Sequence, residues 1–126
     1  MSAKKILVLA GLMALIIIAG CRSAHVTSAI IYIDQQMFDK AIGVLHEGLD
    51  YSPDEAEAYF YLGEAHSKKA EEDIRDNAYL EASRNYGMAY DYYQKTLAME
   101  PGLYEKVEES LLYSYIMQSN NAKNEY

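Results

Sequence analysis

Few residues of this sequence have the types and spacing that chemistry at a site requires. The three histidines, His25, His46 and His66, are scattered, and no two share a helix face at ligand spacing. The acidic run Glu71-Glu72-Asp73 lacks the Asp-x-Asx-x-Asx-Gly turn of a calcium loop. The motifs of serine hydrolases, zinc proteases and phosphate-binding glycine loops are absent from the sequence. The sequence therefore predicts neither an enzyme nor a metal site, and an enzyme with an unrecognised carboxylate pair is only a remote alternative.

The single cysteine, Cys21, follows a segment that is typical of export signals. Lys4 and Lys5 precede an apolar run from Ile6 to Ala19, which is short for a transmembrane helix of about 20 residues. The residues Ile18-Ala19-Gly20-Cys21 resemble a bacterial lipobox, in which the signal is cut between Gly20 and Cys21. The resemblance implies a covalent lipid on Cys21 as a membrane anchor, and no other cofactor. An ordinary signal peptide and an uncleaved anchor are the alternatives.

The overall charge restricts the class of partner. The chain has 126 residues with 11 basic and 19 acidic side chains, and its net charge is −8. Removing residues 1–20, which contain two lysines and no acid, leaves a net charge of −10. This balance argues against nucleic acid, because phosphate binding needs clustered Lys and Arg. The length predicts one domain, and a single cysteine excludes an internal disulfide.

The residues after Cys21 follow a helical pattern. Apolar side chains recur at intervals of three and four, as in the stripe of Tyr86, Ala89, Tyr93 and Leu97. The only two prolines, Pro53 and Pro101, each close one of these segments. The pattern therefore predicts an all-α protein.

These segments resemble the tetratricopeptide repeat (TPR), a helical hairpin of about 34 residues. Tyr59-x2-Leu62-Gly63-x2-His66 matches the first helix of that repeat, and Ala41-x3-Leu45 with Pro53 matches the second. The resemblance implies about two hairpins and a C-terminal capping helix in residues 25–118, after a signal peptide (1–20) and a lipidated N-terminus (21–24), and before a polar tail (119–126). The implied core positions are Phe38, Ala41, Leu45, Tyr59, Leu62, Gly63, His66, Tyr86, Ala89, Tyr93 and Leu97.

The second hairpin departs from the repeat. The spacing from Leu62-Gly63 to Ala89 exceeds the standard one by about 14 residues, which is two heptads. We expect each helix of this hairpin to be longer by about two turns, with Asp76-Asn77 at the tip and Asn77 as an N-cap. A flexible acidic loop is the alternative.

Partners of TPR proteins usually lie against the first helices of the hairpins. Carried over to this sequence, the resemblance implies a partner-binding face of Ile30, Ile33, Asp34, Glu57, Phe60, Glu64, Lys68, Leu112 and Tyr115. Apolar and acidic residues at these positions favour a protein or peptide partner with an apolar or basic helical segment. Five tyrosines fit no core position of the repeat and suggest protein interfaces or self-association: Tyr61, Tyr92, Tyr104, Tyr113 and Tyr115.

Together these observations predict a lipid-anchored TPR protein of a bacterial cell envelope, acting as an adaptor or assembly factor. The outer membrane is favoured if the source has one, because Arg22 and not Asp follows Cys21. The alternative function is that of a self-associating structural lipoprotein, which would form a homo-oligomer.

Overall fold

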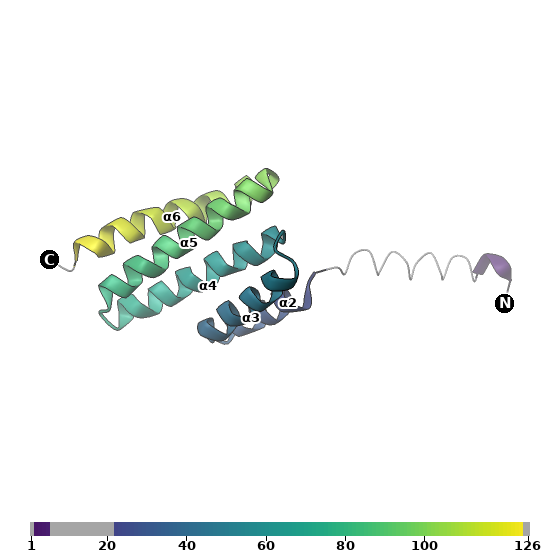
Figure 1. Ribbon diagram of the computed structural model, residues 1–126, viewed down its shortest axis with the longest axis horizontal. Coiled ribbons are helices and arrows are strands. Elements are labelled where there is room, and N and C mark those ends of the chain that lie inside the picture. The colour runs from purple at the N-terminus through teal and green to yellow at the C-terminus, as the bar shows by residue number, and fades with distance from the viewer. Residues whose placement is uncertain (1, 6–21, 125–126) are drawn as a thin grey trace.

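The computed structural model describes residues 2–5 and 22–124, and the main helical region begins at Ala24 (Figure 1). The elements are α2 (Ala24–Asp34), α3 (Phe38–Tyr51), α4 (Ala56–Arg75), α5 (Tyr79–Met99), the short 3-10 helix η1 (Pro101–Leu103) and α6 (Tyr104–Lys123). No strand is present among the described residues. The prediction of an all-α, TPR-like fold is confirmed.

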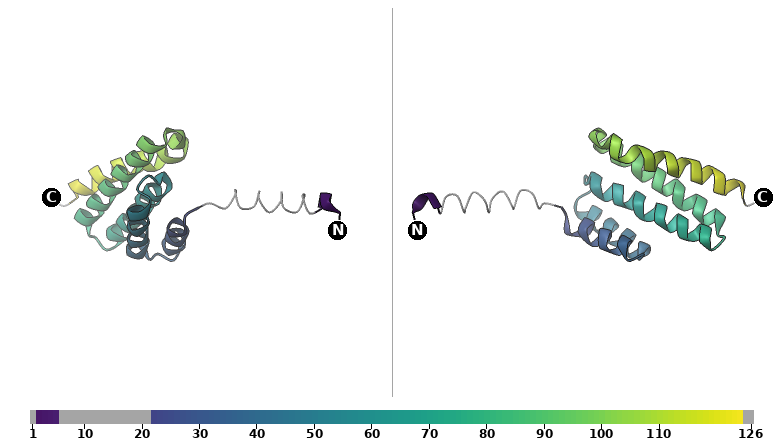
Figure 2. Two further views of the ribbon diagram at one scale, coloured as in Figure 1. Left: turned by 45° about the vertical axis from the view of Figure 1, so that its right-hand side comes forward. Right: turned by 180° about the vertical axis from the view of Figure 1, so that it is seen from behind.

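The helices pack as antiparallel neighbours in chain order. Helix α2 packs on α3, α4 on α3 and α5, and α5 on α6. Figures 1 and 2 show α6 at one edge of this stack and α2 with α3 at the other. Within the described residues, no helix is both long and apolar enough to cross a membrane.

The turns of the two hairpins have the same backbone geometry. Gln36 follows the C-cap of α2 and Asn77 follows that of α4, and both have a left-handed backbone with φ 59°. After α4, the amide of Ala78 donates to the carbonyl of Asp73 and that of Asn77 to Ile74, which is a Schellman motif. The same pair of bonds follows α2. Asn77 therefore closes α4, and the prediction that it caps α5 is wrong, since the N-cap of α5 is Ala78.

The longer second hairpin is helical throughout, as predicted. Helix α5 has 21 residues against 14 in α3, a difference of one heptad, and α4 has 20 against 11 in α2. A seven-residue extension advances a helix by nearly two whole turns, so the added residues continue the same buried stripe. Ala70, Ala82 and Tyr86 accordingly form a core cluster of their own in the added part.

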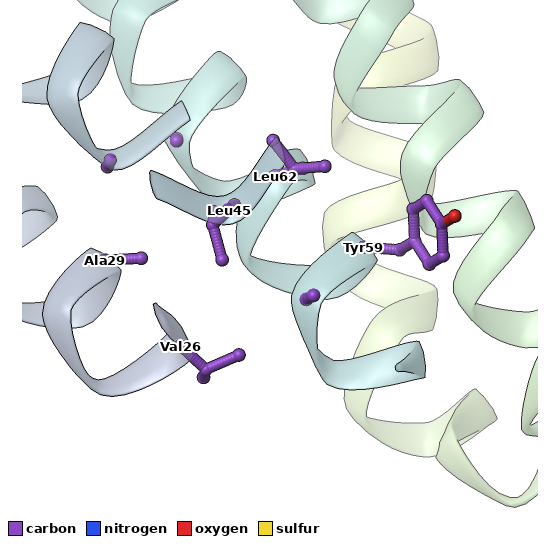
Figure 3. Close-up of a cluster of buried hydrophobic side chains, with 8 residues drawn as sticks. Val26, Ala29, Leu45, Tyr59 and Leu62 are labelled. Carbon is purple, nitrogen blue, oxygen red and sulfur yellow. The ribbon is translucent and has the colours of Figure 1, made fainter. Parts of the chain in front are cut away.

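Most predicted core positions are buried. Val26 and Ala29 of α2 point toward Leu45 of α3 and Leu62 of α4 (Figure 3). Of the eleven core positions that the repeat pattern implies, ten are buried and Leu97 is half-buried. The sequence predicts a polar tail from residue 119, whereas α6 continues to Lys123 because Asn121 is buried and donates to the carbonyl of Met117.

Candidate functional site

A groove lies where α4 and α6 face each other across α5. We call it the α4–α6 groove, and it has a volume of about 270 Å³. One face of α4 forms its first wall, and one face of α6 forms the other, with a buried tyrosine of α5 between them. The lining residues are Glu64, Ser67, Lys68, Glu71, Tyr93, Glu109, Ser110 and Tyr113.

Tyr93 fixes the floor of the groove. Its ring is fully buried and packs against Phe60 with centroids 5.9 Å apart. Its hydroxyl donates a hydrogen bond to the carboxylate of Glu64. Burial and the Glu64 carboxylate together raise the pKa of the Tyr93 phenol, so this hydroxyl stays protonated and holds Glu64 in place.

The walls of the groove are acidic. Lys68 and Glu71 form an exposed ion pair at 3.2 Å, and such a pair contributes at most about 1 kcal/mol to stability. Among the described residues, neither Glu64 nor Glu109 forms an ion pair. Two carboxylates therefore have no basic side chain bound to them in the groove itself.

An aromatic cluster continues the groove toward the start of α4. Tyr61 lies one turn before Glu64 on the same face of α4, and its ring meets Phe60 edge-on at 5.1 Å. The ammonium of Lys106 lies 4.5 Å from the Phe60 ring centroid and 5.9 Å from that of Tyr61. Arg22 lies 6.0 Å from the Tyr61 ring and bonds Glu57 at 2.7 Å.

Burial and nearby charged side chains together raise the pKa of the Tyr61 phenol. Burial of the phenol raises its pKa most, the nearby Arg22 lowers it, and three carboxylates raise it again. Those carboxylates belong to Glu57, Glu64 and Asp34. Tyr61 also packs against the core cluster that contains Val26 and Ala29, so its ring joins the first hairpin to the groove.

Comparison with family models gives one match. Residues 28–115 match the family described as plant specific mitochondrial import receptor subunit TOM20. The chain belongs to this family. No curated protein matches the chain, and no solved structure matches it either. The matched residues include the walls of the α4–α6 groove from Glu64 to Tyr113.

The TOM20 family corrects the identification made from the sequence. The predictions of a bacterial lipoprotein, of an adaptor in a bacterial cell envelope, and of a periplasmic or bacterial outer-membrane location are wrong. The bacterial assignment rested on the lipobox resemblance of Ile18 to Cys21, residues that lie outside both the matched and the described residues. The structure thus tests neither the cleavage after Gly20 nor the lipid on Cys21.

Other predictions agree with membership of the TOM20 family. An import receptor subunit is a binding protein, which supports the prediction that the chain is not an enzyme. Within the described residues, no three His, Asp or Glu side chains are grouped so that they could hold a metal ion.

The structure divides the predicted partner-binding residues among several places. Glu64 and Lys68 line the groove, Glu57 and Phe60 adjoin Tyr61, and the Asp34 charge acts on Tyr61. Ile30 and Ile33 are half-buried against the first core cluster. Leu112 and Tyr115 lie elsewhere, in a second hollow of about 260 Å³ whose other lining residues are Tyr90, Tyr104, Glu108 and Leu111.

The register of α6 explains the groove residues that the sequence reasoning missed. Glu109, Ser110 and Tyr113 face the groove, because Val107 and Ser114 are the positions fully buried against the stack. The register carried over from the repeat pointed to Leu112 and Tyr115 instead, and α6 lacks the Leu-Gly pair that fixes the register of α4. A usable signal was Tyr113 itself, one of the tyrosines that fit no repeat core position.

His66 has a structural role at the interface of α4 and α5. His66 is buried and its Nδ1 donates to the amide oxygen of Asn85 at 2.9 Å, while Asn85 donates to Asp73 at 2.8 Å. Burial lowers the pKa of His66, so the neutral ring is favoured. Tyr92, one of the unassigned tyrosines, stacks on His66 at 5.6 Å and on Tyr59 at 6.3 Å. Tyr92 also meets His46 of α3 edge-on with ring centroids 6.2 Å apart, and this contact joins the two hairpins.

Proposed function

We propose that the chain is a receptor subunit for protein import into mitochondria and that its α4–α6 groove holds a basic, amphipathic targeting segment. The partner is then a protein or peptide, as expected from the sequence. The single observation that carries the proposal is the arrangement of Glu64 and Glu109, two carboxylates without an ion pair among the described residues, beside the exposed ring of Tyr113 in one groove. The family description supports it, because an import receptor subunit recognises proteins.

Charge favours a basic partner. Five carboxylates surround the groove and the Tyr61 cluster, against three basic side chains, and the acids are Asp34, Glu57, Glu64, Glu71 and Glu109. Mitochondrial transit peptides are rich in Arg and poor in acidic residues. Such a segment supplies the cations that Glu64 and Glu109 lack, and the net charge of the chain steers it toward the protein.

Aromatic contacts favour an amphipathic helix. Tyr61 is half-buried and Tyr113 is 43% exposed, so both rings retain apolar surface for a partner. The stretch of α4 from Tyr61 to Glu71 is about 15 Å long at 1.5 Å per residue, which matches roughly three turns of a bound helix. A helix laid in a groove uses apolar anchors at intervals of three and four, with its charges along the rim.

The proposal is tested by direct binding. The full chain in detergent micelles is titrated with a fluorescent amphipathic peptide of about 15 residues that has Arg on one face, Leu on the other and no acid. We expect saturable binding that weakens with salt. The variant Glu64→Gln/Glu109→Lys is expected to bind about tenfold more weakly, because two rim carboxylates are lost. Gln at position 64 keeps an acceptor for the Tyr93 hydroxyl.

A matched variant controls for the general charge of the chain. Glu47→Gln/Asp91→Lys makes the same change of charge at exposed positions of α3 and α5 that line neither the groove nor the second hollow. This control is expected to keep most of the affinity. Equal losses in both variants, or binding that no rim substitution reduces, would contradict the groove as the binding site.

A further inference from the structure

The outermost face of α6 is unlike the surface expected at the end of a helical stack. Val107, Ser114 and Asn121 are buried seven residues apart and turn toward α5. The opposite side, which we call the α6 outer face, consists of Glu105, Leu112, Ile116 and Lys123. Figures 1 and 2 show that no other helix of the described residues covers this edge.

The middle of the α6 outer face is apolar. Leu112 is 57% exposed and Ile116 is 46% exposed, and they lie one turn apart at the centre of the helix. Terminal repeats of helical stacks normally present a polar outer face, because no further repeat covers them. Two exposed branched aliphatic side chains at this position therefore indicate a surface that another helix covers.

The ends of the α6 outer face carry opposite charges. All three acidic residues of α6 lie in its first half, at Glu105, Glu108 and Glu109, and Lys123 lies at its far end. The other basic residue of α6, Lys106, lies over the Phe60 ring. Two such helices packed in parallel would bring the acids of both copies together. Packed antiparallel, each acidic half meets a half without acid, and the helix dipoles also oppose each other favourably.

We propose that a second copy of this chain docks on the α6 outer face, with the two α6 helices antiparallel about a two-fold axis. The spacing of the four residues fits that symmetry, because Glu105 precedes Leu112 by seven residues and Lys123 follows Ile116 by seven. Leu112 of one copy then lies opposite Ile116 of the other, and Glu105 lies opposite Lys123 at both ends. Such an interface is self-complementary, as two-fold dimers require.

This surface is separate from the groove of the proposed function. The outer-face residues do not line the α4–α6 groove, whose α6 wall is Glu109, Ser110 and Tyr113. A dimer joined through α6 therefore leaves two grooves free, one in each copy. Loss of the dimer and loss of peptide binding are consequently distinguishable by mutation.

Sedimentation velocity of the full chain in a density-matched detergent tests the dimer. We expect a concentration-dependent dimer that Leu112→Glu/Ile116→Glu weakens by about tenfold or more, since central apolar anchors dominate such interfaces. Met88→Glu, which changes an equally exposed apolar residue of α5, is the matched control and is expected to leave the dimer unchanged. A monomer at every concentration, or a dimer that survives the double variant, overturns the proposal.

A charge exchange tests the antiparallel arrangement. Glu105→Lys and Lys123→Glu are each expected to weaken the dimer, because each puts like charges opposite one another. The double variant Glu105→Lys/Lys123→Glu restores opposite charges and is expected to recover the dimer. A double variant that is no better than the single ones overturns the arrangement, and docking by an unlike partner helix would appear as a monomer in this assay.

Discussion

At the scale of single residues, Gly63 sets how closely α4 and α5 approach each other. A Cβ atom added at Gly63 would lie 2.5 Å from Cε1 and 2.8 Å from Cδ1 of Tyr93. Tyr93 cannot move aside easily, because its ring is fully buried and its hydroxyl is bonded to Glu64. The absence of a side chain at Gly63 therefore lets Tyr93 form the floor of the groove.

Gly63→Ala is expected to destabilise the protein by about 1–3 kcal/mol, as overpacking of a tight core contact does. Urea unfolding of the full chain in detergent, followed by circular dichroism, measures the change. Gly43→Ala is the control, since a Cβ at Gly43 meets no atom within 4 Å in an exposed stretch of α3. It is expected to stabilise by about 0.5–1 kcal/mol, because Ala loses less backbone entropy than Gly in a helix. A gain of stability in both variants would contradict this account of Gly63.

The sequence predicts Gly63 as a core position but not its partner groups. The Leu62-Gly63 pair is a local motif, so the close contact of helices that it indicates is visible in the sequence. The bond between Tyr93 and Glu64 joins residues that lie 29 positions apart, and it depends on the packing angle of α4 and α5. The spacing of residues along the chain does not determine that packing angle.

At the scale of elements, the same turn follows α2 and α4 with different residues in the strained position. Gln36 and Asn77 both have φ 59°, a region that glycine adopts without strain and asparagine with little. Gln carries a longer side chain with no such preference. The first turn of the two therefore holds more backbone strain than the second.

Gln36→Gly is expected to raise the free energy of unfolding by about 0.5–1 kcal/mol, because it removes the left-handed strain at the end of α2. Asn77→Gly is expected to give a smaller gain. Thermal unfolding of both variants beside the unaltered chain measures the difference. A loss of stability in Gln36→Gly, or a larger gain in Asn77→Gly, would contradict the assignment of strain.

The lengths of the elements were predictable, whereas their ends were less so. A surplus of two heptads kept the apolar stripe in phase, so the sequence predicts longer helices in the second hairpin. Asn77 suits both an N-cap and a left-handed C-terminal position, and the sequence alone does not choose between them. The backbone amides of Ala78 and Asn77 donate hydrogen bonds to carbonyls at the end of α4, so Asn77 takes the left-handed C-terminal position.

At the scale of the whole molecule, two separate surfaces are proposed to bind two different partners. The α4–α6 groove is acidic and aromatic and is proposed to receive a basic helical segment, while the α6 outer face is apolar at its centre and is proposed to dock a second copy. The repeat resemblance implies a protein or peptide partner and puts Leu112 and Tyr115 on one face with Glu64 and Lys68, whereas the structure places them in the second hollow. The reason is that their positions depend on the rotation of α6 about its axis.

The central claim is that the groove of this TOM20 family member receives the targeting segment, and photo-cross-linking tests it most directly. A basic amphipathic peptide with a benzophenone on its apolar face is irradiated with the full chain, and the attachment points are mapped by mass spectrometry. We predict attachment between Tyr61 and Glu71 of α4 and between Glu109 and Tyr113 of α6. Attachment confined to the second hollow, at Tyr90, Tyr104 or Tyr115, would contradict the account.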